Sequence, residues 1–232
     1  MARQVIRTKD FAQEAAEFIS AVARAALSER GEFRIALSGG NTPRPVYAQL
    51  AQNELPWERA VVTFGDERCV PPQDEQSNFK MATETLLEPA HVPPTSVLRM
   101  RGEIEPAIAA DEYQQQLDTL AAQRGEKIYL HDLILLGIGQ DGHTASLFPE
   151  TAALKEVNRR VSANYVPKLQ AWRLTFTFPL ILAAREICFL VDANTSASLI
   201  EQIFSGDQSL PASRVDREAQ HVTWILRQRA EL

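Results

Sequence analysis

Short apolar runs alternate with longer segments of helical periodicity along most of the chain, and this alternation constrains the fold more than any other feature. Residues 133–136 and 187–191 are entirely apolar, as is typical of strands buried on both faces of a parallel sheet. Between such runs, apolar residues recur at helical spacing, as they do from Phe11 to Ala26. The pattern predicts an α/β fold with an open, mostly parallel, Rossmann-like sheet and helices on both faces.

The expected elements follow from the same periodicities and from end signals. Thr8 or Asp10 is expected to cap a helix that ends at Gly31, and Ser77 to cap one that Pro89 ends. Further helices are expected at 46–50, 104–124 and 199–204. Strands are expected at residues 33–37, 61–64, 97–100, 133–136, 173–178, 187–191 and 222–226.

Composition excludes several classes of protein. A length of 232 residues with 45% hydrophobic residues suits one domain spanning 1–232. The net charge of −6 and the scattered basic residues argue against a nucleic-acid partner. Cys69 and Cys188 form no CxxC pair, so neither a disulfide framework nor a zinc site is suggested. No secretion signal or membrane-spanning run is visible, and we expect a reduced, cytoplasmic protein.

A glycine-rich segment, residues 137–149, directly follows the apolar run 133–136. Its glycines allow a tight turn that places Asp141 and His143 just beyond the carboxyl end of a strand, where open α/β sheets bind ligands. Residues 137–142 also match the dinucleotide fingerprint, but Pro149 limits any following helix and no strand ends in an acidic residue at the required distance. NAD is therefore not expected, while a histidine that merely caps a turn stays an open alternative.

Two other expected strands end in loops whose residues could bind a ligand. After residues 33–37 come Ser38, Gly39, Gly40, Asn41, Thr42 and Pro43, followed by a helix start. Free backbone N–H groups of such a loop and helix start converge on one point and can hold an anion, with Arg44 as an added cation. The alternative is an ordinary tight turn. After residues 61–64 come Asp66, Glu67 and Arg68, which are either a solvated loop or part of the same cleft.

Together these loops resemble one known family, the 6-phosphogluconolactonases, which hydrolyse 6-phosphoglucono-δ-lactone to 6-phosphogluconate in the pentose phosphate pathway. The matching stretches are residues 37–43, 65–72 with 77–79, and 137–149; residues 173–176 and 210–214 also resemble family positions. The resemblance covers most of the chain, and the combination of motifs is far more specific than any one of them.

The resemblance implies a lactonase without cofactor or metal, acting on a small phosphorylated sugar lactone, as a monomer or a small homo-oligomer. His143, with an ordinary pKa near 6.5, is the expected general base for water, and Asp141 is expected to orient it or stabilise its charged form. No serine nucleophile is expected, because the Gly-x-Ser-x-Gly elbow is absent. The residues expected to bind substrate are Ser38, Gly39, Gly40, Asn41, Thr42, Arg44, Asp66, Arg68, Lys168 and Arg173.

The same fold houses glucosamine-6-phosphate deaminases, so an amino-sugar phosphate isomerase or a non-catalytic sugar-phosphate binding protein stays an alternative. Two residues favour the lactonase: Phe148 stands where the deaminase pattern has Glu, and Arg68 where it has Tyr. Two positions depart from the lactonase pattern. Lys168 is followed by Leu-Gln instead of Pro-Pro, and Ser196 stands where the family often has a lysine, so one anion contact of the family has no counterpart there.

Overall fold

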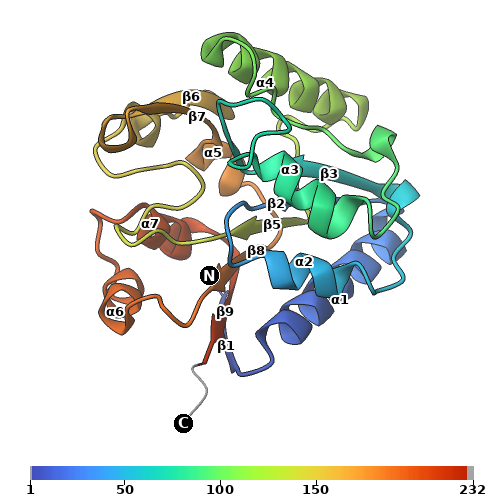
Figure 1. Ribbon diagram of the computed structural model, residues 1–232, viewed down its shortest axis with the longest axis horizontal. Helices are drawn as coiled ribbons and strands as arrows, with labels where there is room; N and C mark the ends of the chain where they lie inside the picture. Colours follow the sequence, from blue (N-terminus) through green and yellow to red (C-terminus); the bar gives the residue numbers. More distant parts are fainter. Residues whose placement is uncertain (1, 229–232) are drawn as a thin grey trace.

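The computed structural model describes residues 2–228, and it is built around a six-stranded parallel sheet (Figure 1). The strand order is β1-β9-β8-β5-β2-β3, and every neighbouring pair is parallel. The strands are β1 (Ala2–Thr8), β2 (Phe33–Leu37), β3 (Ala60–Phe64), β5 (Leu133–Leu136), β8 (Ile187–Val191) and β9 (His221–Arg227). The predicted open, mostly parallel sheet is confirmed.

Helices cover both faces of this sheet, because successive side chains of each strand point to opposite sides. In β5, Leu133 and Leu135 pack against one hydrophobic cluster, while Ile134 and Leu136 pack against another. The first cluster also takes the apolar sides of α1 (Phe11–Arg30), α2 (Arg44–Leu50) and α3 (Asn78–Ala82). The second takes those of α4 (Pro106–Gln123), α5 (Phe178–Ile181), α6 (Ala197–Ser205) and α7 (Pro211–Glu218). None of the helices within residues 2–228 is long and apolar enough to cross a membrane.

A second, antiparallel sheet continues from the carboxyl end of β3. It has the order β4-β7-β6 and consists of β4 (Asp66–Arg68), β6 (Val161–Val166) and β7 (Ala171–Phe176). The backbone N–H of Phe176 donates to the carbonyl of Gly65 at 2.8 Å, which fixes β7 beside the turn between β3 and β4. The tip of the β6–β7 hairpin is a 3₁₀ turn, Pro167–Leu169. This small sheet therefore brings Asp66, Arg68, Lys168 and Arg173 to the same end of the main sheet.

Several sequence predictions were wrong in detail. Residues 97–100 form no strand, only an isolated bridge from Val97 to Val62. The strand expected at 173–178 ends at Phe176, because Thr177 precedes a short helix with a proline in its first turn. Asp10 precedes α1 without a side-chain capping bond; the Thr8 hydroxyl accepts the Asp10 N–H instead. The expected Ser77 cap is confirmed: its hydroxyl accepts the Lys80 N–H at 3.1 Å.

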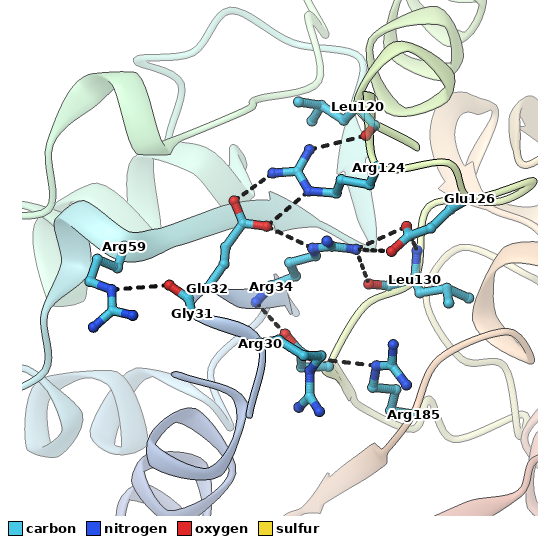
Figure 2. A network of polar contacts seen from close by, with 11 residues as sticks. Arg30, Gly31, Glu32, Arg34, Arg59, Leu120, Arg124, Glu126, Leu130 and Arg185 are labelled. Atoms are coloured by element: carbon cyan, nitrogen blue, oxygen red, sulfur yellow. Dashed lines mark hydrogen bonds and ion pairs between the residues drawn. The ribbon is translucent and has the colours of Figure 1, made fainter. Parts of the chain in front are cut away.

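The opposite edge of the sheet, where the strands begin, is fastened by arginine–carboxylate pairs (Figure 2). Arg34 donates to Glu32 and to both oxygens of Glu126, and Arg124 reaches the other side of Glu32. Asp132, which precedes β5, accepts from Arg30 and from the backbone of Arg34. At this edge carboxylates lie beside the arginines, whereas Arg68 and Arg173 at the carboxyl edge pair with no carboxylate within residues 2–228.

Candidate active site

Three loops meet at the carboxyl ends of β5, β2 and β3, which are adjacent in the sheet. Together with the tip of the β6–β7 hairpin they enclose a cavity of about 640 Å³, a volume that suits a small ligand. Its lining is Ser38, Gly39, Gly40, Thr42, Asp66, Arg68, Gly137, Ile138, Gly139, Gln140, Asp141, His143, Ala145, Ser146, Phe148, Lys168, Leu169 and Arg173. The loops that the sequence singled out separately therefore form one site.

His143 is held by the loop after β5 in a defined orientation. Its Nδ1 lies 2.5 Å from Oδ1 of Asp141, and its backbone carbonyl accepts the N–H of Gly139 at 2.9 Å. Gly142 adopts a left-handed φ of 73° between them, a conformation that favours glycine. The Thr144 hydroxyl closes the loop by donating to the carbonyl of Gly137. Asp141 thus contacts the imidazole directly, and it occupies Nδ1, which leaves Nε2 as the nitrogen for a ligand.

The environment of His143 keeps its imidazole uncharged at neutral pH. Burial is the largest effect and lowers the pKa of His143 to about 4. The Asp66 carboxylate opposes this change, whereas the guanidinium groups of Arg173 and Arg68 add to it. The Asp141 carboxylate that contacts this imidazole is itself paired with the ammonium of Lys168. A neutral imidazole with Nδ1 hydrogen-bonded to a carboxylate can accept a proton at Nε2.

Lys168 reaches the site from the hairpin tip. Its ammonium pairs with Oδ2 of Asp141 and lies 4.9 Å from the ring centre of Phe148. The side chain is about half exposed, at 52%, so this pair is accessible to a ligand. An anion that enters the cavity can therefore compete with Asp141 for Lys168.

Arg68 and Arg173 lie directly opposite each other on the antiparallel strands β4 and β7. Like charges in this position repel each other. Within residues 2–228 their guanidinium groups donate to backbone carbonyls, those of Gln76 and Trp172, and no carboxylate pairs with either guanidinium. Burial and then Arg68 lower the pKa of Arg173, which shows that the two cations are close and partly desolvated. Such a pair is stabilised by an anion between or beside its members.

Asp66 and Glu67 are neighbours in β4, but their carboxylates make different contacts. Asp66 lines the cavity and accepts the Ser146 hydroxyl at 2.6 Å, while the Asn78 side chain donates to it at 3.2 Å. Glu67 is turned away and only 3% exposed, with its oxygens accepting backbone N–H groups of residues 68, 78 and 79. The interpretation as a solvated charged loop is therefore wrong for Glu67, whose carboxylate anchors the start of α3.

The Ser38 loop is packed against this polar scaffold. The Tyr47 hydroxyl accepts the N–H of Ser38 at 2.9 Å and donates to its carbonyl at 2.8 Å, which pins the end of β2. A Cβ on Gly39 would lie 1.8 Å from Oδ1 of Asn78, so only glycine fits there. The hydroxyl of Ser38 is buried, lines the cavity and has no hydrogen-bond partner within residues 2–228. It is therefore available to a bound anion.

The structure brings ten of the twelve predicted site residues to the cavity, and two lie outside its lining. Asn41 is exposed, and Arg44 is half-buried at the start of α2, two positions after the lining residue Thr42. Ser196 is also outside: its hydroxyl accepts the Leu199 N–H and begins α6. No catalytic or binding role was predicted from the sequence for eight lining residues: Gly137, Ile138, Gly139, Gln140, Ala145, Ser146, Phe148 and Leu169. Seven of these eight belong to the motif 137–149, so the whole motif was the signal that could have found them.

Comparison with known proteins identifies the class that this fold and site define. The family model described as glucosamine-6-phosphate isomerases/6-phosphogluconolactonase matches residues 7–224, and the chain belongs to this family. A 6-phosphogluconolactonase of Synechocystis is 39% identical over 209 residues, which cover 88% of this chain and 86% of the relative.

Solved structures agree with this assignment. The 6-phosphogluconolactonase of Trypanosoma brucei superposes with a TM-score of 0.83 at 28% identity, covering 97% of this chain and 95% of the other. A monomeric glucosamine-6-phosphate deaminase superposes with a TM-score of 0.80 at 19% identity, covering 97% of this chain and 98% of the other. The second likeness shows the fold alone, so the choice of reaction rests on the site.

Proposed function

We propose that this chain hydrolyses 6-phospho-D-glucono-1,5-lactone to 6-phospho-D-gluconate in the oxidative pentose phosphate pathway, with His143 as the general base. The observation that carries the proposal is the geometry of His143: Asp141 holds its Nδ1, and the residue lines a cavity together with the basic side chains of Arg68, Lys168 and Arg173. The 6-phosphogluconolactonases among its relatives supply the substrate class.

The reaction needs a base that activates water, a group that stabilises the oxyanion at C1 and a proton for the departing ring oxygen. Nε2 of His143 takes a proton from water as the water oxygen attacks C1 of the lactone, and the C1 carbonyl becomes an oxyanion. The bond from C1 to the ring oxygen then breaks, and the imidazolium returns its proton to that oxygen. The imidazole is uncharged again once it has returned this proton, and the product carboxylic acid loses its own proton to solvent.

We infer that the cations act at two ends of the substrate. The guanidinium groups of Arg173 and Arg68 are close enough to His143 to lower its pKa. Both therefore suit the oxyanion that forms at C1, the reacting end of the lactone. The Ser38 hydroxyl and the Gly39–Gly40 backbone lie on the loop after β2 and suit the phosphate, with Lys168 as its side-chain partner. We infer no part for a metal, because this division already supplies every charge that the reaction needs.

Phe148 argues against the deaminase alternative. It lies at the place where ring opening of an amino sugar would require a carboxylate beside the histidine, and its ring stacks on the imidazole instead. The acidic net charge and the free cysteines fit a cytoplasmic enzyme without a nucleic-acid partner, as a monomer or small homo-oligomer.

The test is acid release after addition of 6-phosphogluconolactone, corrected for spontaneous opening. Turnover that disappears in His143→Gln, while glucosamine 6-phosphate releases no ammonia, supports the proposal. Ammonia release would favour the deaminase. Stabilisation of the protein by 6-phosphogluconate with no turnover of either compound would indicate a binding protein.

A further inference from the structure

Phe148 lies beneath the proposed base and is almost fully buried, with 5% of its surface exposed. Its ring stacks on the imidazole of His143, with ring centres 3.9 Å apart and an interplanar angle of 24°. The ammonium of Lys168 lies 4.9 Å from the centre of the same ring. One aromatic side chain thus contacts both the base and a cation of the cavity.

We propose that Phe148 is a positioning residue, whose ring fixes the plane of the His143 imidazole, shields it from water and steadies the ammonium of Lys168. The proposal rests on the proposed function, since it assumes that His143 is the base. Phe148 itself transfers no proton.

The need for such a support follows from the other contacts of the imidazole. The hydrogen bond from Nδ1 to Asp141 fixes one edge of the ring but leaves it free to tilt about that bond. The backbone of Gly139 lies against the edge of the imidazole that carries Nδ1 and Cε1. The approach is so close that a Cβ on this residue would lie only 2.0 Å from both atoms. A stacked ring 3.9 Å away removes the remaining freedom, so that Nε2 keeps one direction.

The same ring contributes to the uncharged state of the base. Burial is the main cause of the lowered pKa of His143, and the face covered by Phe148 is part of that burial. The charged groups around the imidazole are Asp141 on its own loop, Asp66 and Arg68 on β4, Arg173 on β7 and Lys168 on the hairpin tip. Of these groups only Lys168 contacts Phe148, so a change in the His143 pKa beyond that seen in Lys168→Ala reports the loss of the aromatic cover.

The test compares Phe148→Leu with Phe189→Leu. Phe189 on β8 is the matched control, because it is fully buried, stacks on Trp224 with ring centres 4.0 Å apart and is not among the residues that line the cavity. Each variant loses one stacked, buried ring, so a general loss of packing affects both. A third variant, Phe148→Tyr, keeps the stacking ring.

We expect Phe148→Leu to lower kcat roughly tenfold to a hundredfold, the scale of a misplaced catalytic group. The pKa of His143, followed by NMR of histidine-labelled protein and assigned with His143→Gln, should rise from about 4 towards 6.5. Inorganic phosphate should bind several-fold more weakly as Lys168 loses its contact. Phe148→Tyr should restore kcat and the pKa, and Phe189→Leu should change only thermal stability.

The proposal is overturned if Phe148→Leu leaves the His143 pKa unchanged and kcat within about twofold of Phe189→Leu. Equal losses of kcat in both leucine variants would also overturn it, because they would reflect general destabilisation. The NMR comparison needs no turnover. If the wild-type chain fails to hydrolyse the lactone, the proposed function fails, while the pKa comparison still decides whether Phe148 governs the imidazole.

Discussion

Gly139→Ala tests how closely the imidazole of His143 is held. Gly139 has no left-handed φ, so alanine causes no backbone strain, yet its Cβ would lie 2.0 Å from Nδ1 and Cε1 and 2.8 Å from Nε2. Ordinary contacts of a Cβ lie at 3.4–4 Å. The imidazole must therefore retreat by more than about 1 Å, which breaks the bond to Asp141 or forces the ring against Phe148.

A displacement of this size costs a general base about 10² in rate, or about 2.7 kcal/mol of transition-state stabilisation. The loss should fall on kcat, because the residues that bind the phosphate are not touched. The assay is initial rate of acid release across lactone concentrations, with thermal unfolding as the check on folding. Gly137→Ala is the control on the same loop, since a Cβ there meets no atom within 4 Å. Gly139→Ala with a kcat within threefold of Gly137→Ala would refute the tight packing of the base.

Further predictions concern charge and pH. Lys168→Ala should raise the KM for the phosphorylated lactone about 10-fold to 100-fold, because one charge-assisted contact is lost, and should leave the KM for unphosphorylated gluconolactone unchanged. Arg44→Ala should alter neither KM, because Arg44 is not among the residues that line the cavity. Because the pKa of His143 is lowered to about 4, kcat/KM should stay flat from pH 8 to 5 and fall only below, and a fall centred near pH 6.5 would contradict the burial of the base. His131 is fully buried with a pKa of about 3, so the unfolded chain binds its proton first as pH falls through 6.5. The free energy of unfolding should therefore fall as the pH is lowered from 6.5 towards 3, by up to roughly 1.4 kcal/mol per pH unit. Urea unfolding at pH 7 and pH 5 should show a smaller fall for His131→Asn than for the wild-type chain.

The strands of the main sheet were predictable where every residue is apolar, because such a short run suits a strand that is buried on both faces. Residues 133–136 and 187–191 are apolar at every position, and both are strands with those bounds. The first strand, Ala2–Thr8, was missed because four of its seven residues are polar. It lies at the sheet edge and is hydrogen-bonded to β9, a partner more than 200 positions away, so no local pattern announces it.

The small sheet was harder to predict for a similar reason. β4 has three residues, all charged, and its pairing with β7 depends on where the chain turns after Gly65. The site residues were predictable from their loops because the carboxyl ends of parallel strands share one edge. Their mutual contacts were not: the sequence left open whether Asp141 touches His143, and the pKa near 6.5 expected for the base ignored its burial.

Two histidines of this chain show what separates a base from a buried ring. His131 and His143 are both desolvated, and both have a lowered pKa. The Thr63 hydroxyl donates to the carbonyl of Ile35, so its oxygen accepts from Nε2 of His131, which fixes the proton on that nitrogen. The other nitrogen of His131 is fully buried and has no hydrogen-bond partner within residues 2–228. His143 has the reverse arrangement, with its bonded nitrogen inside and its free nitrogen at a cavity, and the glycines before it make that exposure possible. Both histidines have a lowered pKa, so what distinguishes them is their position: His131 precedes β5 and is fully buried, whereas His143 follows β5 and lines the cavity.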